Sequence, residues 1–361
     1  MALVSVGDYH RRAAEILPPI ALEYFQGAAD RAQTRALNRT AYDRIRIRPR
    51  VLMNVVNRQL GFSILGLPFD MPLGISPTAL QRLAHGEGEV ATARAAQAMR
   101  VPYVMSMFAS SSIEGVARAA PDGTKWIQLY LYKNRQISEA VVRRAEKAGF
   151  RAIVLTIDSP VSGLVRGQIR ESLKFPDGIQ LEIFRSLVDE GIIERVELSD
   201  VVGFDPALTW RDVEWLKSIT LLPVIVKGVL TREDALKAIQ IGVDAIMVSN
   251  HGGRQLDSVS ATIDVLPEIV SSVRGRVPII IDGGIERGID VFKALAIGAN
   301  MVFIGRAAVW GLAVAGQNGV EEILRRISLE LDNTMALAGC PTIADITKDR
   351  IQHATEHCEE I

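Results

Sequence analysis

Eight short apolar runs between residues 71 and 304 constrain the fold of this chain more than any other feature of its sequence. Each run is nearly continuous in apolar character, which is typical of strands in a parallel sheet covered on both faces. The runs span residues 71–75, 102–105, 126–131, 152–156, 223–226, 245–248, 278–281 and 301–304. Helical segments alternate with them and include residues 86–99, 138–148, 232–241, 263–273 and 288–297.

This alternation predicts a (β/α)₈ TIM barrel, because such a barrel closes with eight strand-and-helix units. A doubly wound sheet is the alternative, since periodicity alone cannot show closure. The 361 residues are enough for one large barrel domain. We expect a single domain in which residues 1–70 form an N-terminal helical extension and the residues after Gly319 form closing helices.

The interval between the fourth and fifth predicted strands is far longer than the others. It runs from residue 157 to residue 222 and includes a polar run at residues 166–172 and an acidic stretch at residues 188–200. Long loops in compact domains are commonly functional. We therefore expect an active-site flap at residues 159–210.

Charge and cysteine content argue against several classes of function. Lys plus Arg number 41 and Asp plus Glu 42, so a net charge of -1 gives no overall field that would attract nucleic acid or an acidic membrane. The cysteines, Cys340 and Cys358, form no Cys-x-x-Cys pair. This argues against a thiolate metal site and fits a reducing compartment.

Targeting signals are the basis for an expected location. The first residues lack the apolar core of a secretory signal, and the apolar stretch at residues 299–315 is interrupted by Arg306 and shorter than the roughly 20 residues that span a bilayer. The final Glu-Glu-Ile does not match a Ser-Lys-Leu peroxisomal signal. We expect a cytoplasmic protein, and a peroxisomal one only if such a signal is missing from this sequence.

Polar residues follow all eight predicted strands, where the catalytic residues of a (β/α)₈ barrel collect. His251 follows one strand directly, as a general base working near neutral pH would. Arg254 lies three residues further on, beyond two glycines, and its planar guanidinium suits a carboxylate. Asp158, after the fourth strand, can orient the imidazole, although a role as a helix or turn cap is the alternative. A base beside a carboxylate-binding arginine predicts an acid substrate.

Lys227 ends another strand and needs a negative or electron-rich partner if it is buried. A flavin ring is one candidate, because a cation near its N1 edge stabilises the reduced form. A salt bridge to Asp158 or Asp282 is the alternative. Glycines follow the seventh and eighth strands, where barrels commonly bind a phosphate. The residues concerned are Gly283, Gly284, Gly305 and Arg306.

Spacing alone assigns no role to two tyrosines, Tyr24 and Tyr130, because such residues are more often part of a core. Four other histidines have no comparable neighbours, and we expect them to be structural. They are His10, His85, His353 and His357.

Taken together, these strand-end motifs resemble the FMN-dependent 2-hydroxyacid oxidase and dehydrogenase family, of which glycolate oxidase is a familiar member. The resemblance extends from about residue 6 to residue 346, and the histidine-arginine run is its most specific part. The motifs are Pro77-Thr-Ala79, Gln128-Leu-Tyr130, Thr156-Ile-Asp158, Lys227-Gly228, Ser249-Asn-His-Gly-Gly-Arg-Gln-Leu-Asp257 and Asp282-Gly-Gly284.

The resemblance implies a role for each matched residue. It implies that His251 takes the proton of the substrate hydroxyl with the support of Asp158, while Arg254 and Tyr24 bind the carboxylate and Tyr130 contacts the hydroxyl side. In family terms the α-hydrogen passes to flavin N5 as hydride, although a carbanion route has also been argued. The resemblance further implies FMN contacts from Pro77, Thr78, Ala79, Ser106, Gln128, Thr156, Lys227, Ser249, Asp282, Gly283, Gly284, Gly305 and Arg306.

The chain departs from the family pattern at three positions. Gly163-Leu-Val-Arg166 stands where family members show Gly-x-Arg, so a second substrate arginine is missing or displaced to Arg166. Ile285-Glu286-Arg287 places a carboxylate where an arginine contacts the FMN phosphate, and Arg287 is the candidate to replace it. Phe108 stands where glycolate oxidases have tryptophan, as in longer-chain 2-hydroxyacid oxidases, which leaves room for a larger substrate.

The resemblance leaves three functions open. The first is an oxidase that converts (S)-2-hydroxy acids to 2-oxo acids and passes electrons to oxygen, giving hydrogen peroxide. The second is a dehydrogenase with a quinone or cytochrome acceptor, and the third is an FMN-binding barrel with weakened catalysis. The absence of a preceding haem domain favours the oxidase. The resemblance also implies a homotetramer.

Overall fold

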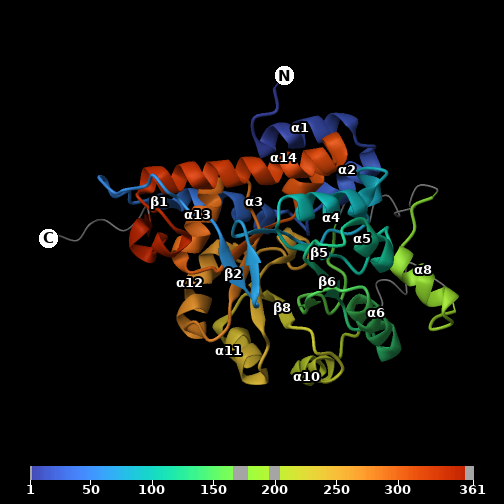
Figure 1. Cartoon of the computed structure of the whole chain (residues 1–361). Coiled ribbons are helices and arrows are strands. Elements are labelled where there is room, and N and C mark those ends of the chain that lie inside the picture. The colour runs from blue at the N-terminus through green and yellow to red at the C-terminus, as the bar shows by residue number, and fades with distance from the viewer. Residues whose placement is uncertain (1, 166–177, 195–203, 354–361) are drawn as a thin grey trace.

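The computed structural model describes residues 2–165, 178–194 and 204–353. Its centre is a closed barrel of eight parallel strands in the order β10-β11-β4-β5-β6-β7-β8-β9 (Figure 1). This confirms the predicted (β/α)₈ barrel and excludes the open doubly wound sheet. The strands are β4 (Leu73–Ile75), β5 (Tyr103–Met105), β6 (Lys125–Leu129), β7 (Ile153–Thr156), β8 (Val224–Val229), β9 (Ala245–Val248), β10 (Ile279–Asp282) and β11 (Met301–Ile304).

The register of the strands aligns their carboxyl ends at one rim of the barrel. Thr156 of β7 pairs with Lys227 of β8, and Asp282 of β10 pairs with Phe303 of β11. Polar side chains that are far apart in the sequence therefore meet at this rim.

A ring of helices covers the outside of the barrel. The five helices predicted from the sequence are present, and α11 and α13 have the predicted bounds. Helix α5 was not predicted, because it has only seven residues and includes Gly115. Local signals fix the ends of α11: the Thr231 side chain accepts a hydrogen bond at its start, and Gly242 adopts φ +79° at its end. The helices are α4 (Gly88–Ala98), α5 (Ile113–Ala119), α6 (Arg135–Lys147), α10 (Trp210–Ser218), α11 (Arg232–Ile241), α12 (Thr262–Val273), α13 (Gly288–Ile297) and α14 (Arg306–Ala338).

A hairpin closes the amino end of the barrel. Its strands, β2 (Phe62–Ile64) and β3 (Leu67–Phe69), pair with each other, and their buried residues Ile64 and Phe69 join the apolar cluster inside the barrel. Within that cluster the Trp126 and Phe303 rings stack with centroids 5.5 Å apart. The amino end of the barrel is thus filled with packed apolar side chains of described residues.

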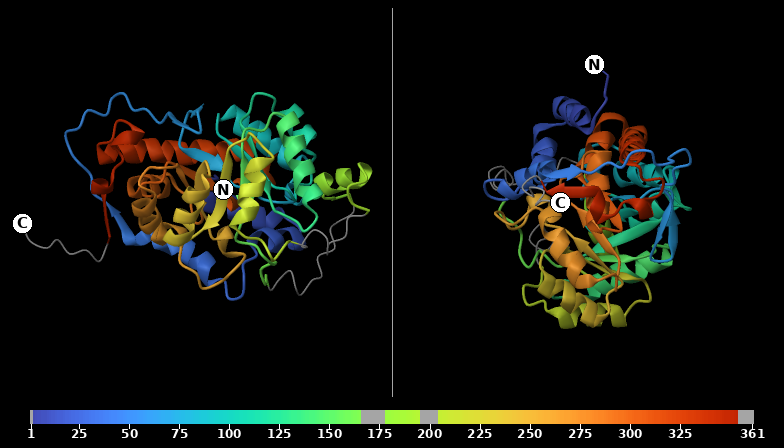
Figure 2. Two further views of the ribbon diagram at one scale, coloured as in Figure 1. Left: turned by 90° about the horizontal axis from the view of Figure 1, so that it is seen from below. Right: turned by 90° about the vertical axis from the view of Figure 1, so that its left-hand side faces the viewer.

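The N-terminal extension contains three helices, α1 (Val6–Ile16), α2 (Pro19–Gln26) and α3 (Gln33–Thr40). Helix α1 packs along α14, as Figures 1 and 2 show. After α3 the chain forms β1 (Ile45–Ile47), which pairs with β12 (Ile351–His353) near the end of the described chain. No helix among the described residues is long and apolar enough to cross a membrane.

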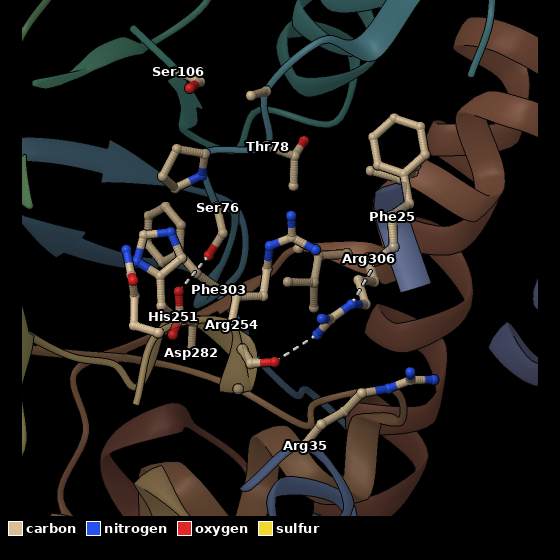
Figure 3. Close-up of a pocket in the computed structure, with 18 of the residues that line it drawn as sticks. Phe25, Arg35, Ser76, Thr78, Ser106, His251, Arg254, Asp282, Phe303 and Arg306 are labelled. Carbon is tan, nitrogen blue, oxygen red and sulfur yellow. Dashed lines mark hydrogen bonds between the residues drawn. The ribbon is translucent and has the colours of Figure 1, made fainter. Parts of the chain in front are cut away.

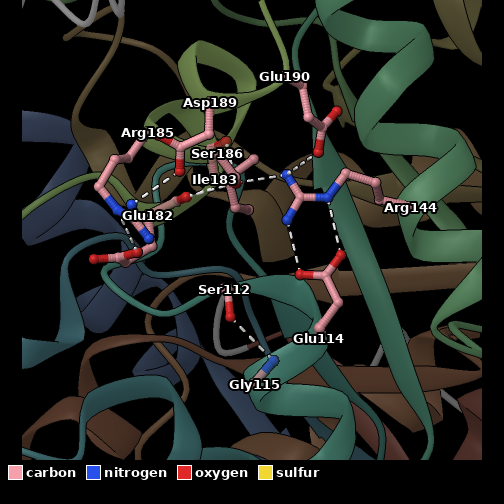
Figure 4. A network of polar contacts seen from close by, with 10 residues as sticks. All are labelled: Ser112, Glu114, Gly115, Arg144, Glu182, Ile183, Arg185, Ser186, Asp189 and Glu190. Carbon is pink, nitrogen blue, oxygen red and sulfur yellow. Dashed lines mark hydrogen bonds and ion pairs between the residues drawn. The ribbon is translucent and has the colours of Figure 1, made fainter.

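Between β7 and β8, the described residues contain helix α8 (Glu182–Asp189), which lies within the predicted flap. Arg144 of α6 connects it to the barrel helices (Figure 4). The Arg144 guanidinium donates two hydrogen bonds to Glu114 of α5, at 2.9 and 2.7 Å, and a third to Ser186 of α8 at 2.6 Å. One arginine thus joins three helices, and Glu190 lies 3.8 Å from it.

Candidate active site

A cavity of about 360 Å³ lies at the carboxyl end of the barrel. Residues from or just after all eight barrel strands line it, as the strand-end argument predicts. They include Ser76, Ser106, Gln128, Thr156, Lys227, His251, Asp282 and Gly305.

His251 and Asp158 form a hydrogen-bonded pair at the cavity wall, with His251 Nδ1 2.9 Å from an Asp158 carboxylate oxygen. His251 has φ +58°, and its backbone N–H donates to Ser249 Oγ at 3.2 Å. Burial acts to raise the pKa of Asp158, but the charge and hydrogen bond of His251, with Lys227, outweigh burial and lower it. Asp158 is therefore an ionised acceptor for Nδ1–H, and this hydrogen bond leaves Nε2 as the ring nitrogen that faces a substrate and can exchange a proton with it.

Arg254 lies close to His251 and is anchored through one nitrogen (Figure 3). Nη1 donates to the backbone oxygens of Tyr24 at 2.8 Å and Gly27 at 3.0 Å, and the guanidinium lies over the Tyr24 ring, 5.3 Å from its centroid. Neither Nε nor Nη2 makes a hydrogen bond within the described part of the chain. These donors suit a substrate carboxylate.

The two tyrosines assigned by resemblance both line the cavity. Burial raises the pKa of Tyr24, and burial together with the nearby Asp158 raises the pKa of Tyr130. Both phenols therefore remain protonated near neutral pH and can donate hydrogen bonds.

An aromatic cluster forms another wall of the cavity. Phe108 stacks on Tyr130 with ring centroids 5.2 Å apart, and it lies 5.8 Å from Phe184 of α8 and 6.1 Å from Phe204. Leu181, just before α8, also lines the cavity. The segment between β7 and β8 thus supplies part of an apolar wall.

Polar groups with unfilled hydrogen-bonding capacity line the deeper part of the cavity. Asp282 accepts a hydrogen bond from Ser76 at 3.0 Å through one oxygen, while its other oxygen is buried without a partner. Lys227 is only 3% exposed, and its side chain makes no hydrogen bond or ion pair with the described residues. The expected alternative, a salt bridge to Asp158 or Asp282, is not formed. A bound polar ligand would satisfy both groups.

Gln128 extends this polar surface. Its side-chain nitrogen donates to Thr156 Oγ1 at 3.0 Å, and its oxygen accepts from Ser106 Oγ at 3.3 Å and from the Met107 amide at 3.2 Å. The network fixes three of the predicted cofactor residues relative to one another.

Glycines and arginines occupy the end of the cavity next to β10 and β11. Gly284 has φ +80°, and a Cβ there would lie 1.9 Å from the backbone oxygen of Asn38 in α3. The Arg306 guanidinium donates to the backbone oxygens of Phe25, Gly252 and Gly27 at 2.8 to 2.9 Å. Burial, with Arg254 and Arg35 nearby, lowers the pKa of Arg306 to about 9. This concentration of positive charge makes the end of the cavity suitable for an anion.

The structure brings most of the predicted site residues to this cavity. Asp158 lies behind His251, and the Ser249 side chain accepts from the His251 amide rather than lining the cavity. Arg166 lies outside the described residues. The predicted residues that line the cavity are Tyr24, Pro77, Thr78, Ala79, Ser106, Phe108, Gln128, Tyr130, Thr156, Lys227, His251, Arg254, Asp282, Gly283, Gly284, Gly305 and Arg306.

The structure does not bring Arg287 to the cavity. Its guanidinium donates to both carboxylate oxygens of Asp290, at 3.2 and 2.7 Å, and lies 3.4 Å from Asp43. Arg287 stands at the start of α13, where a carboxylate in the first turn is a strong partner for it. This local contact directs the side chain away from the site.

Several cavity residues could not be found by examining strand ends. Most come from the N-terminal extension, and His10 was expected to be merely structural; its ring stacks on Trp310 at 4.7 Å. The one sequence signal for any of them was the carboxylate of Glu286 at an expected arginine position. The missed residues include His10, Phe25, Arg35, Asn38, Arg39, Leu181, Phe204, Glu286 and Trp310.

Comparison with known proteins decides the family. The model of the FMN-dependent dehydrogenase family matches residues 13–353. The chain belongs to this family. It is 44% identical to a peroxisomal (S)-2-hydroxyacid oxidase of Arabidopsis thaliana over 99% of both chains, and 44% identical to glycolate oxidase of Spinacia oleracea over 97% of this chain and 96% of that protein.

A solved structure agrees with this assignment. A mandelate oxidase crystallised with benzoylformic acid superposes with a TM-score of 0.88, at 37% identity, and covers 97% of this chain and 98% of that one. FMN is the cofactor of the family. The cavity fits FMN. The unpartnered Lys227 ammonium suits the electron-rich flavin ring, and the unpartnered Asp282 oxygen suits the hydroxylated ribityl chain. The end of the cavity that holds Arg306 suits the phosphate.

Proposed function

We propose that this protein oxidises (S)-2-hydroxy acids to 2-oxo acids and passes the electrons through FMN to oxygen, giving hydrogen peroxide. One observation carries the proposal: the His251–Asp158 pair and the unoccupied donors of Arg254 face the same cavity as the residues that suit FMN. This arrangement provides a base, a carboxylate site and a redox cofactor within one enclosure.

The residues divide the work between binding and proton transfer. Arg254 holds the substrate carboxylate through Nε and Nη2, and the protonated Tyr24 hydroxyl is placed to assist it. His251 Nε2 takes the hydroxyl proton, and the Asp158 carboxylate stabilises the imidazolium that results. Bound FMN supplies the acceptor for the two electrons of the substrate C–H bond. Lys227 provides a positive charge that offsets negative charge on a reduced ring.

The aromatic cluster favours substrates with a large side chain. Phe108 is smaller than the tryptophan of glycolate oxidases, and together with Phe204 and Leu181 it presents an apolar surface to the cavity. We expect aryl and C6–C8 aliphatic 2-hydroxy acids to bind better than glycolate, since burying each additional CH₂ contributes about 0.8 kcal/mol. Replacing Phe108 with Trp should shift the preference back toward glycolate.

One anaerobic experiment tests the reaction. The purified flavoprotein is mixed separately with glycolate, L-lactate, 2-hydroxyhexanoate, 2-hydroxyoctanoate and mandelate. The visible absorbance band of the oxidised flavin is followed over time. Bleaching by any of these acids supports substrate oxidation, and no bleaching by any of them would favour a barrel with weakened catalysis. Fast reoxidation by air with peroxide formation supports the oxidase. Slow reoxidation in air but fast reoxidation by a quinone or cytochrome would replace it with the dehydrogenase.

We further propose a homotetramer in the cytoplasm. Exposed apolar side chains support self-association: Val51, Leu52 and Val56 are 81%, 101% and 81% exposed on the segment before the hairpin. Light scattering tests the assembly, with a monomer at micromolar concentration contradicting it. Imaging of the tagged full chain tests the location, and a punctate peroxisomal pattern, as the name of the Arabidopsis relative would suggest, would overturn it.

A further inference from the structure

Four charged side chains gather at the end of the cavity next to β10 and β11. Arg35 and Arg39 come from α3, Arg306 follows β11, and Glu286 follows β10. In Figure 3, Arg306 lies between Arg254 and Arg35. Burial and the nearby Arg35 and Arg39 also lower the pKa of His10, which indicates a positive field at this end.

Helix α3 is held firmly against the two glycine-containing loops of the site. Asp257, six residues after His251, accepts hydrogen bonds from the backbone amides at the start of α3, including that of Thr34 at 2.8 Å. The side chains of Asn38 and Asn250 exchange two hydrogen bonds of 2.8 Å. A Cβ at Gly253 would lie 2.7 Å from the Arg35 amide nitrogen. Arg35 therefore has a fixed place in the site.

The three arginines differ in how much hydrogen-bonding capacity remains. Arg306 donates from all three of its nitrogens to backbone oxygens. Arg39 forms an ion pair with Glu286 at 3.1 Å and is 61% exposed. Arg35 is half-buried and donates only from Nη1, to the Gln26 oxygen at 2.6 Å. Within the described chain its Nε and Nη2 have no acceptor.

We propose that Arg35 binds the phosphate of FMN, in place of the barrel arginine whose position is occupied here by Glu286. The inference rests on the proposed use of FMN and adds a residue of the N-terminal extension to its binding site. Arg39 neutralises Glu286, and Arg306 contributes positive charge while its nitrogens hold the backbone in place. The amides of the nearby glycine loops complete the anion site.

Charge supports this assignment over the barrel residues alone. A phosphate monoester carries a charge of about -1.5 to -2 at neutral pH. Glu286 by itself would repel it, and the ion pair with Arg39 only cancels that repulsion. Arg35 lines the cavity and supplies a cation with two donors that no described residue occupies, and a guanidinium can bind two phosphate oxygens at once.

The test compares FMN with riboflavin, which has the same ring and ribityl chain but no phosphate. Dissociation constants of both are measured from the quenching of flavin fluorescence with the full-length apoprotein. For Arg35→Leu we expect the dissociation constant of FMN to rise on the order of 10- to 100-fold, because charged hydrogen bonds to the phosphate are lost. The riboflavin constant should stay within about twofold.

Two further variants make the result specific. Arg31→Leu is the matched control, because Arg31 is an exposed arginine just before α3, and it should leave both constants unchanged. Glu286→Arg in the Arg35→Leu background should restore FMN affinity by returning the cation to the barrel loop.

Four outcomes would count against the inference or against its premise. Unchanged FMN binding by Arg35→Leu, or an equal loss of FMN and riboflavin, would overturn the role of Arg35. Failure of Glu286→Arg to restore FMN affinity would do the same. If the unaltered protein bound neither flavin, the use of FMN itself would fail, which is a separate result. Arg35→Gln, with a smaller change of shape, serves if Arg35→Leu unfolds.

Discussion

The reactive end and the phosphate end of the cavity are built from different parts of the chain. At the reactive end, His251, Asp158 and Lys227 each lie at the end of a barrel strand or within three residues of it. At the phosphate end, Arg35 and Arg39 come from a helix that precedes the first barrel strand by more than thirty residues.

This difference shows which residues can be replaced at each end of the cavity without loss of its function. The reactive groups depend on strand geometry, and the chemistry needs them within hydrogen-bonding distance of one another. A phosphate needs only sufficient positive charge and donors, which can come from any element that reaches it. Substitutions at the reactive end should therefore change rates, while those at the phosphate end should change cofactor affinity.

The largest expected effect separates the two ends most clearly. Replacing His251 with Ala should slow anaerobic flavin reduction by about 10²- to 10⁴-fold, because the base for the hydroxyl proton is removed. FMN affinity should be unchanged. Stopped-flow absorbance measures the first quantity and fluorescence titration the second. Reduction at the original rate would refute the role of His251.

Asp158→Asn tests the support that the base receives. We expect flavin reduction to slow about 10- to 100-fold, since an amide cannot stabilise the imidazolium as a carboxylate does. The pKa of Asp158 is lowered from its ordinary value of 3.8, so its ion pair stabilises the fold above that pH and is lost as pH falls toward the folded pKa. Chemical denaturation should show a shallower loss of stability below about pH 4 for the variant. Equal slopes would contradict the lowered pKa.

Glu286→Gln tests the phosphate end with a change of opposite sign. Removing this carboxylate should tighten FMN binding about 3- to 10-fold, because one negative charge near the phosphate is lost. Riboflavin affinity and the rate of flavin reduction should not change. Fluorescence titration with both flavins measures the effect. Weaker FMN binding would show that Glu286 contributes to the site through Arg39.

Arg144→Met tests whether α8, within the predicted flap, contributes to either end. Loss of the contacts to Glu114 and Ser186 should loosen α8, and with it Leu181 and Phe184 beside the aromatic cluster. We expect KM for mandelate to rise about two- to fivefold, with KM for glycolate unchanged. Arg143→Met is the control, because among the described residues Arg143 forms ion pairs only with Glu139 and Glu146 of its own helix. Equal KM changes for both acids would argue against a side-chain role for α8.

The sequence was sufficient for the parts of the molecule that are determined locally. Strands of a buried parallel sheet must be apolar along their length, so all eight could be recognised, and polar residues directly after them had to meet at one rim. The pairing of His251 with Asp158 followed from this geometry. The resemblance then identified the cofactor, which spacing alone could not do.

Residues placed by distant packing could not be predicted in this way. Arg35 lies in a short polar helix whose sequence gives no sign that it faces a cavity, and its position depends on Asp257 and on close contact with Gly253 and Gly284. Arg287 was a reasonable substitute from its place in the sequence. Asp290 accepts the hydrogen bonds of the Arg287 guanidinium instead, because the two residues are only three positions apart and lie in the same helix turn.

The hydrogen bonds from the start of α3 to Asp257 also have a consequence for synthesis on the ribosome. The carboxylate that accepts from the Thr34 amide belongs to a residue 223 positions later. At a translation rate of about 5–20 residues per second, α3 emerges roughly 11–45 s before that cap exists. A helix of eight residues is marginal in water by itself. We therefore expect α3 to become stable only after most of the barrel has been made.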